Sequence, residues 1–327
     1  MSAALREGLP VRLELSGAPP REIRLDELAP LCYAASARDP RDQRVLDSFR
    51  APVARPGSDA QVTAIIPCNH GSPLGAPALF KQDVAVRLLV LSNGPDGPTR
   101  VPGAEILQVE WRGHGPTRQA ALSQVRDPYV FFTVQDAIPM GAGFLRTMIE
   151  ALEAGGWDAV VARQLAWPDA DRVTRERLRR WTPAGHLVVP FKQTDNVATL
   201  YRTSALRRWP FPEVPIAEDA VWSRGRRVGY VPLAPVLHSH SRVAGELFRR
   251  NRDIHAELSL VGELPPVASL AGVLGALPGV IRPALIGGAG ELQCQVGELL
   301  GQWRGAVRGK KMAKKGRKKD KRKADKR

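Results

Sequence analysis

The sequence predicts an α/β protein with a mostly parallel sheet flanked by helices, followed by C-terminal helices and a disordered basic tail. Three observations support this prediction. Short apolar runs of strand length alternate with helical segments through most of the chain. Residues 264–307 are rich in Leu, Val, Ala and Gly, with few charges before Arg304. Lys and Arg then dominate residues 304–327.

We expect residues 1–58 to form an N-terminal extension. Two runs, 11–15 and 22–25, alternate apolar and polar side chains on either side of a Gly- and Pro-rich turn. This pattern predicts a small hairpin, which we expect a short helix to follow. Pro, Gly and Ser in residues 51–58 are typical of a linker into the main domain, placed at 59–255.

The main domain is predicted from alternating strands and helices. Strands are expected at 62–67, 86–91, 104–109, 129–134 and 159–162. A helix is expected at 116–124, and another carries the apolar face formed by Phe144, Leu145, Met148, Ile149 and Leu152. Such a sheet binds ligands, nucleotides among them, at the carboxyl edge of its strands. Neither GxGxxG nor GxxxxGK[ST] is present, which disfavours dinucleotide and P-loop sites.

Two further parts of the chain lack this regular pattern. Residues 165–193 hold five arginines and little apolar content, which favours an exposed helix and a mobile loop. Three closely spaced prolines between 210 and 215 indicate irregular structure in the second half.

Asp136 directly follows the run Tyr129–Val134, and Pro139 prevents the strand from continuing. A carboxylate at the end of a parallel strand can hold a divalent cation against a substrate pyrophosphate. The alternative is that Asp136 caps a helix that begins near Gly141.

Charge and cysteine content narrow the class of protein. Residues 304–327 carry 14 Lys or Arg and two Asp, a net +12 of the total +15, which leaves +3 for residues 1–303. The three cysteines form no CxxC pair or Cys/His cluster, so a reducing, cytoplasmic setting is expected. The N-terminus lacks the apolar core of a signal peptide. Residues 268–289 are broken by two prolines and an arginine, which argues against a spanning helix.

Four ordered segments carry a family resemblance. They are VTAIIPCN from Val62, LLVLSNGPDG from Leu88, FFTVQDAIP from Phe131, and AEDAVWS from Ala217 with the later GYVP and His238-Ser239-His240. Together they resemble the inverting family 2 glycosyltransferases with a GT-A fold, and most closely the rhamnosyltransferase-like branch. The resemblance covers about residues 60–250. It implies transfer of a sugar from a nucleotide-sugar donor, with dTDP-rhamnose as the branch-level donor, in cell-envelope polysaccharide synthesis.

The resemblance also implies a divalent cation, Mn2+ or Mg2+. Asp136 would bind it. Gln135 can supply only a neutral oxygen where many relatives have a second carboxylate, and Ala137 supplies no ligand. His238 and His240 would share one face of a strand and complete the site, which favours a borderline ion such as Mn2+. The alternative is that these histidines form local hydrogen bonds in a loop.

For catalysis, the resemblance implies two residues, Asp219 and Glu218, with Asp219 as the general base. Two adjacent carboxylates repel each other, which raises the pKa of one of them and suits a base. The alternative, compatible with catalysis, is that both cap a helix before Trp222.

The donor and acceptor sites follow from the same resemblance. The expected donor-binding residues are Pro67, Asn69, Asn93, Asp96, Arg118, Gln135 and Asp136. For Arg118, which lies in the first turn of a predicted helix, surface ion pairing is the alternative. The acceptor is a glycan or a lipid-linked glycan, and its expected contacts are Asn196 and Trp222, with core packing as the alternative role of Trp222.

We expect the C-terminal region to lie at a membrane. Residues 256–303 are predicted to form proline-broken amphipathic helices that lie on a bilayer or pack on the domain. The basic tail 304–327 would hold the enzyme on an anionic, cytoplasmic membrane surface. The tail has no interleaved aromatic residues, so no specific nucleic-acid partner is expected.

Two other functions are alternatives to glycosyl transfer. A nucleotidyltransferase would need a Gly-rich signature with Arg or Lys near the first strand, which IIPCNHGSPLG lacks. A noncatalytic sugar-nucleotide-binding or scaffold relative is the main alternative, because the metal motif is reduced.

Overall fold

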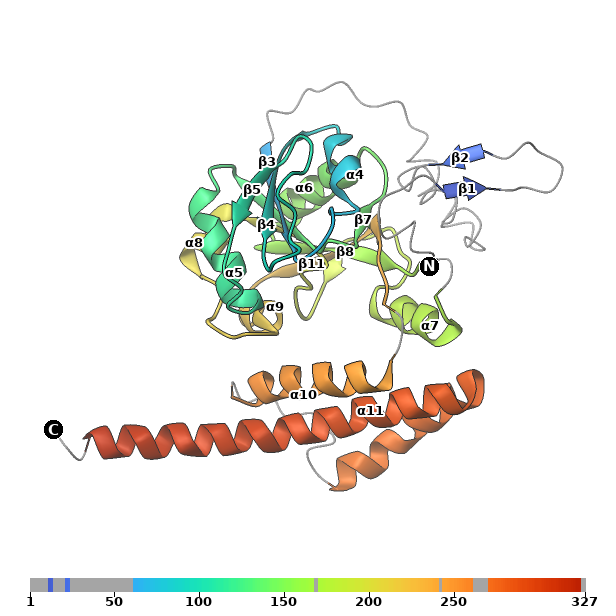
Figure 1. Cartoon of the computed structure of the whole chain (residues 1–327), viewed down its shortest axis with the longest axis vertical. Coiled ribbons are helices and arrows are strands. Elements are labelled where there is room, and N and C mark those ends of the chain that lie inside the picture. Colours follow the sequence, from blue (N-terminus) through green and yellow to red (C-terminus); the bar gives the residue numbers. More distant parts are fainter. Residues whose placement is uncertain are drawn as a thin grey trace.

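The computed structural model describes residues 11–13, 21–23, 61–167, 170–240, 243–260 and 270–324. An α/β body carries the sheet, and two helices, α10 (Ala244–Leu260) and α11 (Leu270–Ala324), lie beneath it in Figure 1. Near the N-terminus, β1 (Val11–Leu13) pairs antiparallel with β2 (Arg21–Ile23), within the segment predicted to form a hairpin. The short helix predicted after the hairpin lies outside the described residues.

The body contains a nine-stranded sheet with the order β5-β4-β3-β6-β10-β8-β11-β7, and β9 pairs with β11. Its longest ladders are parallel, namely β3 with β4 and β8 with β11, while β7, β9 and β10 pair antiparallel with their neighbours. The strands are β3 (Gln61–Cys68), β4 (Ala85–Ser92), β5 (Glu105–Gln108), β6 (Tyr129–Thr133), β7 (Ile138–Pro139), β8 (Ala159–Leu165), β9 (Val189–Pro190), β10 (Ala198–Arg202) and β11 (Val228–Leu237).

Strand residues face two cores in alternation, because successive side chains of a strand point to opposite faces. In β3, Val62, Ala64 and Ile66 belong to one core and Ile65 to the other. The first core is covered by α4 (Ala76–Phe80) and α6 (Phe144–Gly155). The second is covered by α5 (His114–Ala121), the short 3-10 helix η1 (Leu122–Gln124), α8 (Thr203–Arg208) and α9 (Glu218–Trp222).

The strand directions bring distant chain segments to one edge of the sheet. The parallel strands β3, β4 and β6 end at this edge. Because β10 runs antiparallel to both β6 and β8, its first residue lies at the same edge, where β8 and β11 also end. The residues that follow β3, β4, β6, β8 and β11, and those that precede β10, therefore converge.

The arginine-rich segment contains one helix, α7 (Arg172–Trp181), whose N-terminus is capped by Asp171. The Asp171 side chain accepts a hydrogen bond from the Thr174 amide at 2.8 Å. The buried residues of α7 are Val173 and Thr174, so most of the helix is solvent-exposed, as its composition predicts.

Helices α10 and α11 pack closely because α11 places a glycine every fourth residue against the backbone of α10. A Cβ added at Gly297, Gly301, Gly305 or Gly309 would lie 2.5 or 2.6 Å from an atom of α10. In three of these cases the nearest atom is a backbone carbonyl oxygen, those of Ala244, Phe248 and Arg252. Small residues at this spacing let two helix backbones approach closely.

The C-terminal helices differ from the expectation. We expected proline-broken helices at 256–303 and disorder after Arg304. Instead α10 begins at Ala244, and α11 continues through Arg304 to Ala324. Lys, Arg and Ala are good helix formers, so the basic segment can extend a helix already fixed by packing on α10. The first part of α11 runs at an angle to the rest (Figure 1), and its Pro278 and Pro283 remove two helical hydrogen-bond donors. Among the described residues, no helix is long and apolar enough to cross a bilayer.

Candidate active site

Asp136, His238 and His240 form a three-residue cluster at the carboxyl edge of the sheet. Their potential metal-binding atoms all lie within 4.8 Å of one another. Asp136 follows β6, and its two carboxylate oxygens lie 3.7 Å from His238 Nε2 and 3.5 Å from His240 Nδ1. Both histidines follow β11, which ends at Leu237, so they act from a loop and not from the predicted strand.

A second layer of contacts orients His238. The Gln164 amide donates from Nε2 to Asp195 at 2.7 Å, which leaves its Oε1 3.3 Å from His238 Nδ1. This arrangement favours a proton on Nδ1 and a free lone pair on Nε2, which lies near Asp136 and 3.1 Å from His240 Nε2. Burial lowers the pKa of His238 to about 4, although the charge of Asp136 acts in the opposite direction. His238 is therefore neutral near pH 7, as a metal ligand must be.

These donors fit a divalent transition-metal ion. The carboxylate is a hard ligand, and the two imidazoles are borderline ligands. Because Asp136 is half-buried and His240 is exposed, the site is open to a substrate. The two imidazole nitrogens that face each other at 3.1 Å could both point their lone pairs at a shared ion. The alternative for Asp136, capping of α6, does not apply, because the N-cap residue of α6 is Gly143 and no side chain caps it.

A second carboxylate group lies in the first turn of α9. Asp219 accepts a hydrogen bond from the backbone N–H of Asn196 at 2.9 Å. Its side chain remains partly exposed. Burial of the carboxylate and the charges of Glu218 and Asp195 raise the pKa of Asp219 to about 7. A carboxylate with this pKa can accept a proton near neutral pH.

Glu218 is held by a buried network. It forms an ion pair with Arg118 of α5, and the two side chains are 2% and 4% exposed. Asn196 donates to Glu218 at 2.9 Å and accepts a hydrogen bond from Tyr201 at 2.8 Å. We expected Arg118 at the donor and Asn196 at the acceptor, whereas the structure places both against Glu218.

The residue before this carboxylate pair has an unusual backbone. Ala217 has a φ of 64°, and it is the only non-glycine residue with positive φ among those the structure describes. The left-handed region costs an L-residue roughly 1 kcal/mol, and such residues concentrate at functional sites. Ala217 is also the N-cap residue of α9, so neither Glu218 nor Asp219 is the cap.

The two clusters are connected through neighbouring residues. Asp195 accepts the hydrogen bond from Gln164, which contacts His238, and the next residue, Asn196, donates its amide to Asp219. Both residues precede β10, which brings them to the same edge as Asp136. Gln164 and Asp195 were not among the predicted site residues. Gln164 belongs to no recognisable motif, and from the segment that contains Asp195 the prediction took Asn196 alone.

The expected donor-binding residues lie along the same edge. Asn69 follows β3, and its backbone amide donates to Gln135 Oε1 at 3.1 Å, which fixes Gln135 beside Asp136. After β4, the buried Asn93 donates its amide to Cys68 O, while Asp96 is exposed. Pro67 is the seventh residue of β3 and is half-buried.

The start of α5 packs closely against the loop that precedes α9. The His114 amide donates to Pro215 O at 2.8 Å, and a Cβ on Gly113 or Gly115 would lie 2.5 Å from backbone atoms of Pro215 or Pro212. The two glycines thus allow close packing against the loop that precedes α9.

Trp222 belongs to the core and not to the acceptor site. It is 3% exposed, packs edge-on against Tyr201 and donates from Nε1 to Trp209 O at 2.6 Å. This corrects the assignment to the acceptor and matches core packing, because the buried ring leaves no face on which a sugar could stack.

Comparison with known proteins identifies the fold. No family model and no curated protein matches the chain. Among solved structures, the mannosyltransferase PcManGT from Pyrobaculum calidifontis, in complex with GDP-Man and Mn2+, has a TM-score of 0.52 at 15% identity. The alignment covers 87% of this chain and 99% of that one. Staphylococcus aureus TarS 1–349 with UDP-GlcNAc has a TM-score of 0.38 at 14% identity, covering 61% of this chain and 66% of that one. The match to PcManGT shows that the chain has the fold of GT-A-type glycosyltransferases.

Proposed function

We propose that this protein is a metal-dependent inverting glycosyltransferase that uses a nucleotide-sugar donor. The observation that carries the proposal is the convergence of two groups at one sheet edge: Asp136 with its two histidines, and Asp219, whose pKa is raised to about 7. The fold shared with PcManGT, which was solved with GDP-Man and Mn2+, supports the same reaction class. The sequence resemblance favours dTDP-rhamnose as the donor.

The metal would be held by Asp136, His238 and His240, and it would neutralise the negative charge that develops on the leaving diphosphate. Gln135 lies beside this group and is held by Asn69 and by His70, whose Nε2 is 2.9 Å from Gln135 Nε2. The exposed Asp96 would accept hydrogen bonds from the base or ribose of the donor, and Gly94 allows the backbone to approach it.

Asp219 would act as the general base. It would take the proton of the acceptor hydroxyl while that oxygen attacks the anomeric carbon and the bond to the diphosphate oxygen breaks. Glu218 would serve a positioning role, because it is buried and paired with Arg118 and Asn196. A direct displacement of this kind inverts the anomeric configuration.

The acceptor would be a glycan or a lipid-linked glycan of the cell envelope, used at the cytoplasmic face of the membrane. The support for a membrane location is the apolar and basic C-terminal region, which the described α10 and α11 present beside the body.

Calorimetric titration with dTDP, UDP and GDP, with and without Mn2+, tests the donor site. We expect one diphosphate to bind selectively and only with Mn2+, and Asp136→Ala to weaken that binding about 100-fold or more, because a bound metal contributes several kcal/mol. Glu150→Ala is the matched control, since Glu150 is an exposed carboxylate on α6. Absence of binding by every diphosphate would contradict the proposal.

A noncatalytic sugar-nucleotide-binding protein is the second candidate, favoured by the single carboxylate of the Gln135-Asp136-Ala137 motif. Such a protein would bind the diphosphate with metal, but Asp219→Asn would leave all its measurable activities unchanged.

A further inference from the structure

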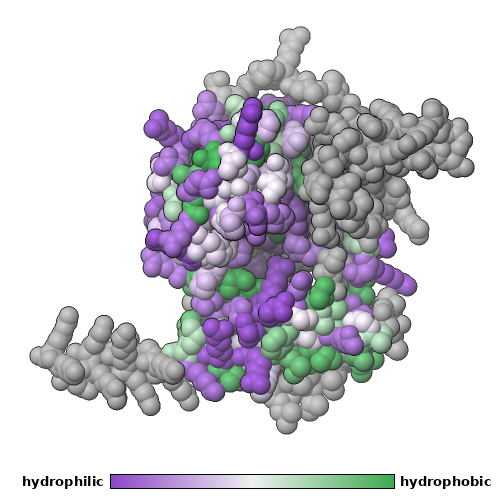
Figure 2. Space-filling view, in the orientation of Figure 1, coloured by the Kyte–Doolittle hydropathy of each residue, from purple (hydrophilic) through white to green (hydrophobic). Residues whose placement is uncertain are grey.

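An apolar stripe runs along the outer side of α11. Leu292, Val296, Leu300 and Trp303 are separated by four, four and three residues, so they lie on one side of the helix. These four side chains remain 44%, 40%, 48% and 40% exposed. The side that faces α10 carries the glycines described above, so the stripe lies outside the α10 contact. Figure 2 shows hydrophobic side chains gathered on this lower layer of the molecule.

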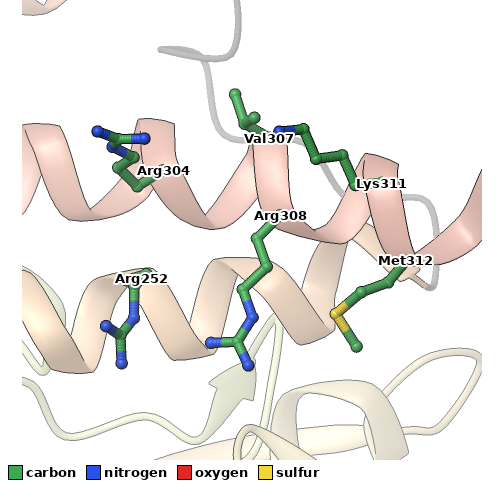
Figure 3. Close-up of a pocket in the computed structure, with 6 residues that line it drawn as sticks. All are labelled: Arg252, Arg304, Val307, Arg308, Lys311 and Met312. Atoms are coloured by element: carbon green, nitrogen blue, oxygen red, sulfur yellow. The ribbon is translucent and has the colours of Figure 1, made fainter.

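A basic hollow lies next to the stripe. It has a volume of about 400 Å³ and is lined by Arg252, Arg304, Val307, Arg308, Lys311 and Met312. Arg252 comes from α10, while Arg308 and Met312 point from α11 toward α10 (Figure 3). Asp253 neutralises part of the charge, since it lies 2.8 Å from Arg252 and 3.1 Å from Arg308. Arg304 and Lys311 form no ion pair with the residues that the structure describes.

We propose that this side of α11 docks on an anionic lipid bilayer, with the stripe in contact with acyl chains and the hollow holding lipid phosphates. A helix that lies in a bilayer interface presents Leu and Trp on one side and Lys or Arg on the other. Trp303 sits where the apolar stripe meets the basic segment, and the Arg304 guanidinium lies 5.3 Å from its ring. Tryptophan is enriched at this depth of a membrane.

Charge favours a lipid surface over a second copy of the chain. Residues 304–327 carry a net +12. Two copies paired in parallel through the stripe would place these segments side by side, at a cost in electrostatic repulsion. An anionic surface attracts the same charges, and each Lys or Arg near it strengthens binding roughly fivefold.

This inference rests on the membrane location proposed above, but vesicle binding tests it without any glycosyl transfer. Full-length protein is sedimented with phosphatidylcholine vesicles, with and without phosphatidylglycerol. We expect binding only to the anionic vesicles, and weaker binding at high salt. Failure to bind the anionic vesicles would overturn the proposal and leave the donor-site experiment unaffected.

Two pairs of variants locate the surface. Leu292→Gln/Leu300→Gln should weaken binding roughly tenfold or more, and Arg304→Gln/Lys311→Gln roughly 30-fold. The controls are Leu187→Gln/Val188→Gln, which changes exposed apolar residues before β9, and Arg175→Gln/Arg179→Gln on the exposed face of α7. Equal binding by variants and controls would exclude this surface. Light scattering that shows a dimer, converted to a monomer by Leu292→Gln/Leu300→Gln, would assign the stripe to a second copy instead.

Discussion

Asp219 is partly exposed to solvent and has a raised pKa, and a general base needs both properties. Burial and the nearby carboxylates raise that pKa to about 7. A general base must be deprotonated, so we expect kcat/KM to rise with pH and level off above about pH 7. Asp219→Asn should lower kcat by roughly 10²–10⁴-fold and remove this limb of the pH profile.

The raised pKa of Asp219 also makes the stability of the folded protein depend on pH: activity rises with pH, whereas the stability contribution of this group falls. A carboxyl group whose pKa is higher in the folded state binds its proton more tightly there, so its contribution is favourable at low pH. That contribution is lost as pH rises from about 4 to about 7. Asp219→Asn should therefore unfold at a higher temperature than the wild type at pH 8, and the gain should shrink toward pH 5. If Asp219→Asn were inactive but showed no pH-dependent gain in unfolding temperature, the group with the raised pKa would not be Asp219.

The buried pair of Arg118 and Glu218 makes a separate prediction about positioning. Glu218→Gln removes one charge and leaves Arg118 buried without its partner, which typically costs about 3–5 kcal/mol. We expect this loss in chemical denaturation. The double variant Arg118→Met/Glu218→Leu, which removes both charges, should unfold at a higher denaturant concentration than Glu218→Gln alone. If Glu218→Gln were fully stable but inactive, Glu218 would have a chemical role and not a positioning one.

At the residue scale, sequence reasoning found groups that belong to motifs and missed those that do not. The sequence grouped Asp136, His238 and His240, and the structure brings their donor atoms together. Gln164 lies inside a buried strand, where nothing local distinguishes it from a core residue. Its role depends on the pairing of β8 with β10, which no short motif encodes.

At the scale of secondary structure, the glycine spacing of α11 predicts a position-dependent response to one type of substitution. Gly→Ala in an exposed helix stabilises by about 1 kcal/mol. At Gly301 and Gly305 the new Cβ would lie 2.5 Å from the Phe248 and Arg252 carbonyl oxygens, so the helices must separate. Overpacking costs about 1–3 kcal/mol per site. We expect Gly301→Ala/Gly305→Ala to unfold the C-terminal helices at lower denaturant.

The matched control lies on the same helix. Around Gly275 and Gly290 nothing lies within 4 Å of an added Cβ, so Gly275→Ala/Gly290→Ala should stabilise α11. Circular dichroism at rising denaturant, with limited proteolysis, measures both variants. Stabilisation by both pairs would show that α10 and α11 do not pack through these glycines.

The sequence predicts helices and strands well where apolar residues recur with a regular period. It does not predict a helix whose formation depends on packing against another part of the chain. The strands β3, β4 and β6 and the apolar face of α6 follow the predicted ranges closely. The helical basic segment was missed, because a run of Lys and Arg carries no apolar period. Its helix is fixed by the preceding packing on α10, which depends on glycines whose partners lie elsewhere in the chain.

At the scale of the whole molecule, the site exists only once the sheet is complete. Asp136 follows β6, Asp195 precedes β10, and His238 follows β11, so three separate segments must meet at one edge. The parallel α/β pattern predicted such an edge, but the antiparallel insertion of β10 between β6 and β8 was not predictable from local sequence. That insertion connects the cluster of Asp136, His238 and His240 to Asp219.

Because a bound ion would link these segments, metal binding should stabilise the folded chain as a whole. Ligand at a hundredfold excess over its Kd contributes about 2.7 kcal/mol, which shifts Tm by roughly 5–10 °C for a domain of this size. We expect Mn2+ with the preferred nucleoside diphosphate to raise Tm by this amount, and chelation by EDTA to reverse it. Gln164→Leu should reduce the metal affinity about 10–100-fold, because His238 loses the group that orients it.

Asp136→Ala should abolish the shift, and Glu150→Ala, the exposed control on α6, should retain it. An equal shift in Asp136→Ala and wild type would mean that the ion binds elsewhere. If the Tm shift were lost in Asp136→Ala but unchanged in Gln164→Leu, Asp136 would still bind the ion. The proposed connection from His238 through Gln164 and Asp195 to Asp219 would then be wrong.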